Sequence, residues 1–243
     1  MKISIIIVNY NNEDLIKKNF CFLNKSKDIQ VIVVNNSNKE LELSDSKVIN
    51  NQNNLGFAKA CNQGIKITKG HYILLINPDI QINEPLDKLI SYMEKNKEVG
   101  ILAPKLLNKD KSLQYSCRRF PKLKSQICHR LFPKSKVVDD YLMKDFDHES
   151  IKEIDWSLGA FLLIRKEVFR DIGLFDERFF LYYEDVDFCL RAKKAGWKTV
   201  YYPFYEVIHL HKQESRKYIN RAFFEHFKSM FKFYKKHGWG FKG

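Results

Sequence analysis

The sequence lacks any apolar run that approaches the ~18 residues of a membrane-spanning helix, and a buried-strand pattern begins directly at its N-terminus. We therefore expect neither a spanning helix nor a secretory signal segment. The expected location is the cytoplasm, where the protein is either soluble or bound peripherally at the inner face of the cell membrane.

Paired cysteines are missing too. The five cysteines lie far apart, their number is odd and none belongs to a CxxC motif (Cys21, Cys61, Cys117, Cys128 and Cys189). This spacing argues against a disulfide framework and a zinc site, so we expect reduced, mostly buried thiols. The sequence also has no repeats or low-complexity segments. Its 243 residues are 44% hydrophobic and 14% aromatic, which indicates a folded protein with a substantial core.

Acidic residues are in short supply. The 29 Asp and Glu face 42 Lys and Arg, which gives a formal net charge of +13. Such a balance favours anionic partners, namely phosphates, nucleic acid or an acidic membrane surface. Nucleic acid is not expected, because the chain has no recognised nucleic-acid-reading module and its basic residues concentrate in two segments.

The segment Tyr72–Asp79, YILLINPD, is the clearest strand signal. Its five apolar residues are too few for a helix and indicate a strand buried on both faces of a parallel sheet. The strand stops at Asn77-Pro78-Asp79, because proline cannot continue the hydrogen-bonded ladder. A lone Asp after a strand is often only a turn residue, but ligands bind at this carboxyl edge of open α/β sheets.

Neighbouring segments repeat this pattern. Strands are predicted at Lys2–Asn9 and Ile29–Val34, each followed by amides or hydroxyls, with a helix at Glu13–Leu23 between them. Further strands are expected at 47–50 and 99–107, and further helices at 58–68, with Gly70 as its C-cap, and at 85–95. We thus predict an α/β fold with a central, mostly parallel sheet flanked by helices, and one polar crevice along the sheet edge.

The second half of the chain begins with a basic segment. Lys105–Lys136 contains ten Lys or Arg and one acid, which fits either a solvated irregular excursion or a basic lip over a phosphate-bearing ligand. A strand-like segment follows at Ile154–Arg165, where Gly159-Ala160 would let a ligand or another backbone come close.

An acidic helix start is predicted after an aromatic strand at Phe179–Tyr183. Acids in a first helical turn are favourable on structural grounds alone. However, Glu184 and Asp187 would share one helix face, while Asp185 would point about 100° away and could face a substrate.

The end of the chain predicts two short strands, Thr199–Tyr202 and Glu206–Leu210, and a basic amphipathic helix over Ser215–His237. His209 in the second strand fits a structural residue or a ligand. The helix carries an apolar stripe (Phe223, Phe224, Phe227, Met230, Phe231 and Tyr234). The helix either packs on the sheet or lies in an anionic membrane interface.

Taken together, five blocks in order resemble the inverting GT-A glycosyltransferases of family two, especially their rhamnosyltransferase-like branch. The blocks are SIIIVNYNN at 4–12, IQVIVVNNSN at 29–38, NNLGFAKACNQGI at 53–65, ILLINPD at 73–79 and GAFLLIRKEVFRDIGLFDERFFLYYEDVDFCLRAKKAGW at 159–197. A histidine follows at 209, and the match covers nearly the whole chain up to about residue 211.

The resemblance implies a nucleotide-sugar donor, a divalent metal (Mg²⁺ or Mn²⁺) on its diphosphate, and single-displacement attack by an acceptor hydroxyl. Asp185 matches the catalytic base, whereas Asp79 and His209 match metal ligands. The donor side comprises Tyr10, Asn11, Asn35, Asn54, Gly56, Phe57 and Asn77, and the remaining substrate-binding positions are Trp156, Gly159, Ala160 and Glu184. Asn35 stands where the family usually has an acid. Because an amide both donates and accepts, the identity of the nucleobase (uracil or thymine) and the geometry of its hydrogen bonds stay open.

The resemblance also predicts a single Rossmann-like GT-A domain over 1–211, with a nucleotide-sugar-binding half at 1–104 and an acceptor-side, catalytic half at 105–211. The basic helix at 212–243 follows it. The expected reaction moves a sugar from dTDP-rhamnose or a UDP-hexose to a hydroxyl of a glycan or lipid-linked acceptor in surface polysaccharide biosynthesis. The alternative is a non-catalytic nucleotide-sugar-binding partner of a glycan assembly complex.

Overall fold

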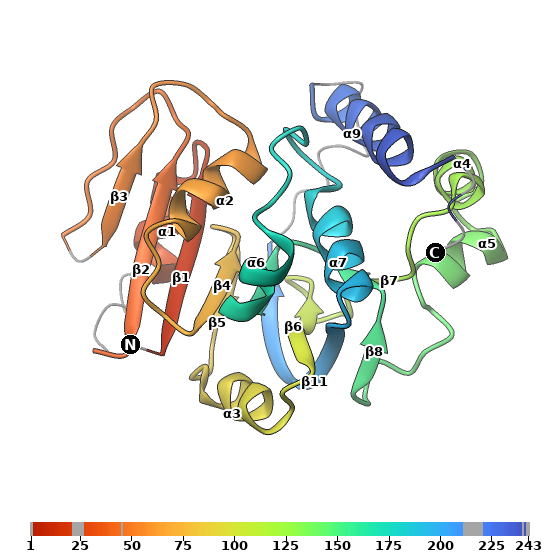
Figure 1. Ribbon diagram of the computed structural model, residues 1–243, viewed down its shortest axis with the longest axis horizontal. Helices are drawn as coiled ribbons and strands as arrows, with labels where there is room; N and C mark the ends of the chain where they lie inside the picture. The colour runs from red at the N-terminus through yellow and green to blue at the C-terminus, as the bar shows by residue number, and fades with distance from the viewer. Residues whose placement is uncertain (1, 21–26, 45, 211–220, 240, 242–243) are drawn as a thin grey trace.

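The computed structural model describes residues 2–20, 27–44, 46–210, 221–239 and 241. A nine-stranded mixed sheet forms its centre, with strand order β3-β2-β1-β4-β10-β6-β11-β5 and β8 beside β11 (Figure 1). The strands are β1 Ile3–Asn9, β2 Ile29–Asn35, β3 Lys47–Asn50, β4 Tyr72–Ile76, β5 Ile80–Ile82, β6 Val99–Leu107, β8 Lys152–Ile154, β10 Phe161–Arg165 and β11 Lys198–His209. A separate two-stranded sheet pairs β7 (Cys117–Arg118) with β9 (Trp156–Ser157).

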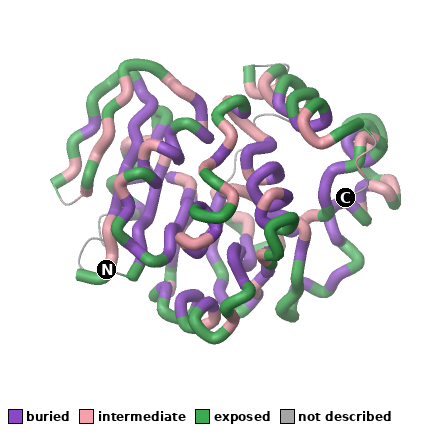
Figure 2. The backbone as a smooth tube through the Cα atoms, viewed as in Figure 1, coloured by how far each residue is buried: buried purple, intermediate pink, exposed green. Residues whose placement is uncertain are grey.

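Helices cover both faces of the sheet. They are α1 Glu13–Phe20, α2 Phe57–Ile65, α3 Asp87–Lys95, α4 Leu123–Leu131, α5 Lys136–Tyr141, α6 Lys166–Ile172, α7 Glu184–Lys194 and α9 Arg221–His237. Alternate residues of β1 divide the core, since Ile6 packs with residues of α2, α6 and α7, whereas Ile5 and Ile7 pack with residues of α1 and α3. The central strands are accordingly buried along their length (Figure 2). The predicted α/β fold with a mostly parallel sheet is confirmed.

The division at 104/105 and the separate C-terminal helix stay predictions. One sheet runs across the first boundary, because β10 pairs with β4 on one side and β6 on the other.

Strand β11 corrects the expectation of two short strands at 199–202 and 206–210. It is one strand of twelve residues, and its register against β6 shifts between Tyr202 and Glu206. Pro203 lies within this shift, where the irregular pairing accommodates a residue that cannot donate to the ladder. The short strand β5, which the sequence did not predict, pairs with the end of β11.

Other predicted segments differ locally. Phe179–Tyr183 forms turns and bends instead of a strand, and the predicted strand at 154–165 breaks at Leu158–Ala160 between β9 and β10. Helix α2 is capped at Lys66, not at Gly70. Gly70 instead packs against β1, where an added Cβ would lie 2.5 Å from the Ser4 nitrogen. The basic segment 105–136 is not fully irregular, since it contains β7 and α4.

Helix α9 packs on the domain through a side of the helix that overlaps the predicted stripe only in part, at Met230 and Tyr234. Ser229, Phe233 and Tyr234 are buried, whereas three aromatics of the stripe are exposed (Phe224, Phe227 and Phe231). The predicted residues 215–220 of this helix lie outside the described part of the chain.

Asp187 of α7 anchors α9 electrostatically. Its Oδ1 accepts hydrogen bonds from Lys236 Nζ at 2.5 Å and His237 Nε2 at 2.8 Å, and its Oδ2 accepts from Arg191 Nε at 2.8 Å. Burial pushes the pKa of Asp187 upward, but these three partners outweigh burial and hold that pKa below its usual value. Asp187 therefore has a structural role. The sequence predicted only that it would share a helix face with Glu184.

Replacement of Asp187 by Asn should cost about 3 kcal/mol of the free energy of unfolding, because it leaves Arg191 and Lys236 without their buried counter-ion. Since the native pKa of Asp187 is lowered, its contribution should be present near neutral pH and be lost as the pH falls below about 4. Urea unfolding at pH 7 and pH 3.5 measures both effects. Lys228→Gln on the same helix, which breaks an exposed pair with Glu225, is the control and should change stability little. Equal effects from the two variants would contradict the anchor.

Candidate active site

Asp79 and His209 meet where β5 and β11 pair. The antiparallel register places His209 opposite Ile80, and the Leu210 N–H donates to the Asp79 carbonyl at 3.0 Å. His209 Nε2 then lies 3.4 Å from Asp79 Oδ1. Two residues that are 130 positions apart in the sequence thus face one another at the sheet edge.

Gln114 orients this histidine. Its Oε1 lies 2.7 Å from His209 Nδ1, and its backbone N–H donates to the Leu106 carbonyl at the end of β6. With the Gln114 oxygen as acceptor, Nδ1 donates a hydrogen bond to it, so Nε2 is the ring nitrogen that faces Asp79. This arrangement is the usual one for a metal-ligating histidine, whose other nitrogen donates to a fixed oxygen. Among the described residues, no group of three or more His, Cys, Asp or Glu side chains could hold a metal ion. A cation held by Asp79 and His209 would therefore take its other ligands from phosphate and water.

A chain of backbone contacts joins this pair to Asp185. The Asn77 N–H, at the end of β4, donates to the Ala160 carbonyl at 2.9 Å. The next residue towards the N-terminus, Gly159, donates its N–H to Asp185 Oδ2 at 2.9 Å. The structure therefore brings together Asn77, Gly159, Ala160 and Asp185, as the sequence predicted for a common site.

The two carboxylates at the start of α7 differ in their surroundings. Asp185 is half-buried and accepts hydrogen bonds from the N–H groups of Gly159 and Val186, whereas Glu184 is buried and its Oε2 has no hydrogen-bond partner among the described residues. Burial raises the pKa of both, and the Asp185 charge raises the pKa of Glu184 well above its usual value. The Gly159 and Val186 N–H groups oppose this rise at Asp185, because they stabilise its charged form.

Unusual backbone geometry leads into this helix. Tyr182 and Tyr183 both have left-handed conformations, with φ of 67° and 68°, immediately before Glu184. The preceding Phe180 carbonyl accepts the Phe57 N–H at 2.7 Å, and a Cβ added to Gly56 would lie only 2.6 Å from that same oxygen. Gly56 also has a φ of 87°, so both its conformation and its surroundings require glycine. The Asn54–Phe57 turn thereby supports the segment that presents Asp185.

Asparagines at the carboxyl ends of β1, β2 and β3 bond to one another. In register, Asn9 Nδ2 donates to Asn35 Oδ1 at 2.9 Å, and Asn35 Nδ2 donates to Asn50 Oδ1 at 2.7 Å. Asn35 is fully buried, and its amide also bonds the Ser37 N–H and the Lys39 carbonyl. All four of its hydrogen-bonding positions are thus used within the protein.

The other predicted donor-side residues stand at the rim of this edge. Tyr10 is 48% exposed, and Asn11 is exposed in a left-handed conformation with φ of 56°. Asn54 is half-buried and its Oδ1 accepts the Gly56 N–H at 2.9 Å. Their roles towards a ligand stay predictions, as does that of Trp156, which is buried and donates its indole N–H to the Arg119 carbonyl at 2.9 Å.

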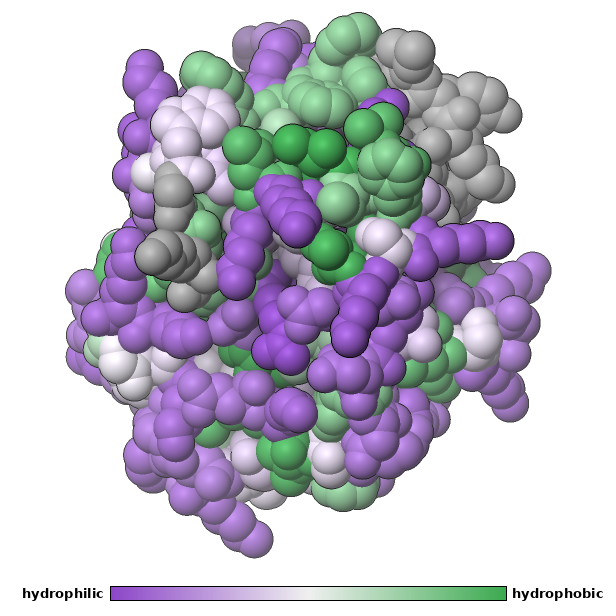
Figure 3. Space-filling view, turned by 90° about the vertical axis from the view of Figure 1, so that its right-hand side faces the viewer, coloured by the Kyte–Doolittle hydropathy of each residue, from purple (hydrophilic) through white to green (hydrophobic). Residues whose placement is uncertain are grey.

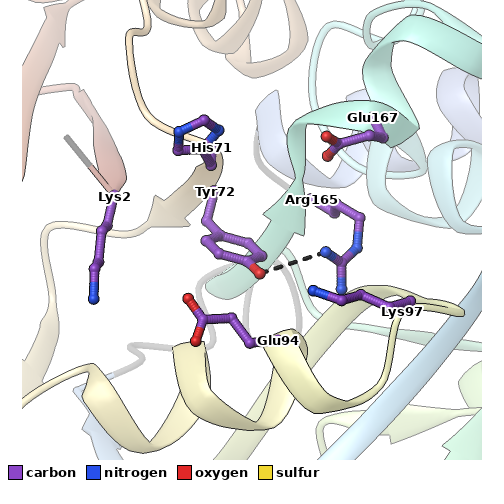
Figure 4. A pocket seen from close by; sticks show the side chains of 7 residues that line it. All are labelled: Lys2, His71, Tyr72, Glu94, Lys97, Arg165 and Glu167. Carbon is purple, nitrogen blue, oxygen red and sulfur yellow. Dashed lines mark hydrogen bonds between the residues drawn. The ribbon is translucent and has the colours of Figure 1, made fainter.

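A hollow of about 350 Å³ lies away from this edge (Figure 4). Lys2 and His71, which line it, precede β1 and β4, so the hollow opens at the amino ends of these strands. Arg165, which also lines it, donates to the carbonyls of Met93, Asn96 and Val99 and to the Tyr72 hydroxyl. These contacts make its guanidinium part of the scaffold, so the candidate site is the carboxyl edge.

Comparison with known proteins agrees with this geometry. The family model described as "Glycosyl transferase family 2" matches residues 4–173, and a second model, "Glycosyl transferase family group 2", matches residues 128–242. The chain belongs to glycosyl transferase family 2. As a member of that family it is a glycosyltransferase that uses a nucleotide-sugar donor.

Similar proteins fall in the expected branch. Rhamnosyltransferase WbbL of Escherichia coli K12 is 30% identical over 94% of this chain and 91% of its own length. An N-acetylglucosaminyl-diphospho-decaprenol L-rhamnosyltransferase of Mycobacterium tuberculosis is 34% identical over 59% of this chain, which spans about half of that relative (48%).

Two solved structures share the fold. GalNAc-T7 with UDP, GalNAc and Mn²⁺ has a TM-score of 0.60 at 14% identity, covering 88% of this chain and 44% of its own. A structure of residues 1–349 of S. aureus TarS has a TM-score of 0.57 at 18% identity, covering all of this chain and 75% of its own.

Two residues that contact the candidate site were not identified from the sequence. Gln114 lies in the basic segment, and no local pattern sets it apart from the other polar residues of that segment. Glu13 accepts hydrogen bonds from Asn9 and Ser37, which connects α1 to the asparagines at the carboxyl ends of β1, β2 and β3. In the sequence, Glu13 is only an acid in the first turn of a helix.

Proposed function

We propose that the protein is an inverting, metal-dependent hexosyltransferase that moves L-rhamnose from dTDP-rhamnose, or a hexose from a UDP-sugar, to a hydroxyl of a lipid-linked or glycan acceptor in surface polysaccharide biosynthesis. The names of the rhamnosyltransferase relatives support the donor, and the diphospho-decaprenol relative supports the acceptor class. The observation that carries the proposal is the carboxylate of Asp185, which accepts hydrogen bonds from two backbone N–H groups beside the end of β4.

Asp185 acts as the general base. It accepts the proton of the acceptor hydroxyl as that oxygen attacks the anomeric carbon of the donor, and the bond to the nucleoside diphosphate breaks in the same displacement. One displacement at that carbon inverts its configuration. The Gly159 and Val186 N–H groups fix the orientation of the carboxylate, which leaves it aimed in one direction during proton transfer.

Replacement of Asp185 by Asn should lower kcat by about 10² to 10⁴ while the donor Kd and the melting temperature stay near wild type, because Asn keeps the size but cannot take the proton. Asn is also a good residue at a helix start, so a structural role of Asp185 would leave activity nearly intact. Radiolabelled transfer and donor titration on this one variant separate the two cases. Transfer near the wild-type rate would end the base assignment.

A divalent cation fits between Asp79 and His209. Their oxygen and imidazole nitrogen suit Mg²⁺ or Mn²⁺, and the contact of Gln114 with Nδ1 orients the ring so that Nε2 faces Asp79. When bound, the cation neutralises charge on the leaving diphosphate. Within the protein, Asp79 and His209 hold this position and the β5–β11 pairing sets their separation.

Replacement of Gln114 by Ala should weaken Mn²⁺ binding in the presence of dTDP by about 10- to 100-fold, because the ring of His209 loses the oxygen that orients it. Electron paramagnetic resonance of free Mn²⁺ measures this without any turnover. Gln52→Ala, in an exposed turn, is the control. Wild-type Mn²⁺ affinity in the Gln114 variant, or full transfer activity in EDTA, would contradict the metal assignment.

Membrane association rests on an apolar surface formed by α4 and α9. Seven of the eleven large hydrophobic side chains that are exposed among the described residues lie there, on these helices or just after them (Ile127, Leu131, Phe132, Phe224, Phe227, Phe231 and Trp239). The guanidinium of Arg130 connects the helices, since it lies 4.1 Å from the centre of the Phe223 ring. Figure 3 looks onto this side and shows apolar side chains gathered near its top, bordered by hydrophilic ones.

The charge around this α4–α9 surface is positive. Residues 111–138 contain eight Lys or Arg and no acid, and the one acid of α9, Glu225, is paired with Lys228. Aromatic side chains beside cations suit the interface of an anionic bilayer. No helix in the described residues is long and apolar enough to cross a membrane.

The wild-type protein should bind vesicles of phosphatidylglycerol and phosphatidylcholine at low salt, and binding should weaken as salt rises because the charges are screened. The double variant Phe227→Ser/Phe231→Ser should bind markedly less in co-sedimentation. Phe204→Ser is the control, because Phe204 is equally exposed but lies on β11. Absence of binding at low salt, or a dimer in light scattering that the double variant abolishes, would contradict membrane docking.

A further inference from the structure

Arg118 lies on β7 and is backed by aromatic rings. The β7–β9 pairing sets Arg118 opposite Trp156, and the guanidinium carbon lies 5.4 Å from the centre of the Trp156 ring and 5.5 Å from that of Tyr141. Both rings are buried, at 5% exposure each. They therefore hold the guanidinium in place and cannot themselves offer a broad surface to a substrate.

Arg118 has no anionic partner in the described part of the chain. It is half-buried, it forms no ion pair or hydrogen bond with a described residue, and its Nε is buried without a hydrogen-bond partner. Its neighbour Arg119 differs, because it is exposed and pairs with Asp140 at 2.9 Å and Asp145 at 3.6 Å. A partly buried cation without a counter-ion is unfavourable unless a ligand supplies the negative charge.

The position of Arg118 relates it to the proposed base. Strand β9 runs directly into Leu158 and Gly159, and the Gly159 N–H is the donor that holds Asp185. Burial raises the pKa of Asp185 and of Tyr183, and the charge of Arg118 opposes that rise. Burial lowers the pKa of His226 to about 4, and the charge of Arg118 adds to that effect. Arg118 is thus close enough to influence Asp185 without forming an ion pair with it.

We propose that Arg118 binds a phosphate group of the acceptor substrate, next to the sugar whose hydroxyl Asp185 deprotonates. The inference rests on the proposed function, because the acceptor hydroxyl must lie within hydrogen-bond reach of the base and its neighbouring groups then fill the space beside it. A planar guanidinium with free N–H groups binds phosphate oxygens in a bidentate manner. The donor diphosphate is the other possible source of phosphate. However, the cation proposed for that diphosphate would bind at Asp79 and His209, which face one another at the β5–β11 pairing, whereas Arg118 lies on β7.

The test compares two acceptors that carry the same sugar, an N-acetylglucosaminyl diphospholipid with a short prenyl chain and the neutral octyl N-acetylglucosaminide. The donor is the nucleotide sugar that wild-type enzyme hydrolyses in a screen. Wild-type enzyme should show a lower KM for the diphospholipid. Arg118→Gln should raise that KM by about 10- to 100-fold, which corresponds to loss of hydrogen bonds to a charged group. It should leave kcat, the KM of the octyl glycoside and the donor Kd within a few-fold.

Arg118→Lys should fall between wild type and Arg118→Gln, since it keeps the charge but not the planar fork. Arg119→Gln is the matched control and should behave as wild type. A raised donor Kd would assign Arg118 to the donor diphosphate and overturn the proposal. An equal loss with both acceptors, or a wild-type enzyme that does not distinguish them, would also overturn it. By contrast, a wild-type enzyme that hydrolyses and transfers no nucleotide sugar would overturn the proposed function itself.

Discussion

The reversed strand β10 is the constraint on which the site depends. It runs antiparallel between β4 and β6, so its first residues lie at the carboxyl end of β4 instead of at the opposite edge. This direction brings Ala160 to the Asn77 N–H and Gly159 to Asp185. In a sheet with β10 parallel to β4, these two residues would stand at the amino edge. The contacts that join the carboxyl end of β4 to the proposed base, Asp185, would then be lost.

The three carboxyl groups at the start of α7 have unequal partners. Asp187 accepts hydrogen bonds from three side chains and serves the packing of α9, whereas Asp185 accepts from two backbone N–H groups. Glu184 is buried beside Asp185 with one oxygen unbonded among the described residues. Three carboxyl groups within four positions of one helix thereby acquire different tasks. What separates them is the surroundings of each side chain, since their intrinsic acidities are nearly alike.

Helix α9 connects the start of α7 to the α4–α9 surface. Its inner side bonds to α7 through Asp187 and to the turn before α7, where Ser229 donates to the Leu181 carbonyl at 2.8 Å. Its outer side exposes aromatic residues next to those of α4. If this surface rests on a bilayer, Arg118 and Asp185 are held at a defined position relative to the lipid phase, which suits an acceptor whose sugar is joined to lipid through phosphate.

The sequence by itself determined the α/β fold, the family, the strand end that carries Asn77 and Asp79, and the helix start that carries Asp185. Buried parallel strands and their polar terminations are local patterns, so a single chain is enough to identify them. Only the tertiary structure decided which polar residues are used by the scaffold and which remain available. Asn35 and Asn11 look alike in sequence, but register with β1 and β3 uses two hydrogen-bonding positions of the Asn35 side chain, and Ser37 and Lys39 use the other two. Gln114 and Arg118 are candidate site residues because β11 and β9, which lie far along the chain, pack beside them. Hydrophobic periodicity carries no record of such long-range pairing.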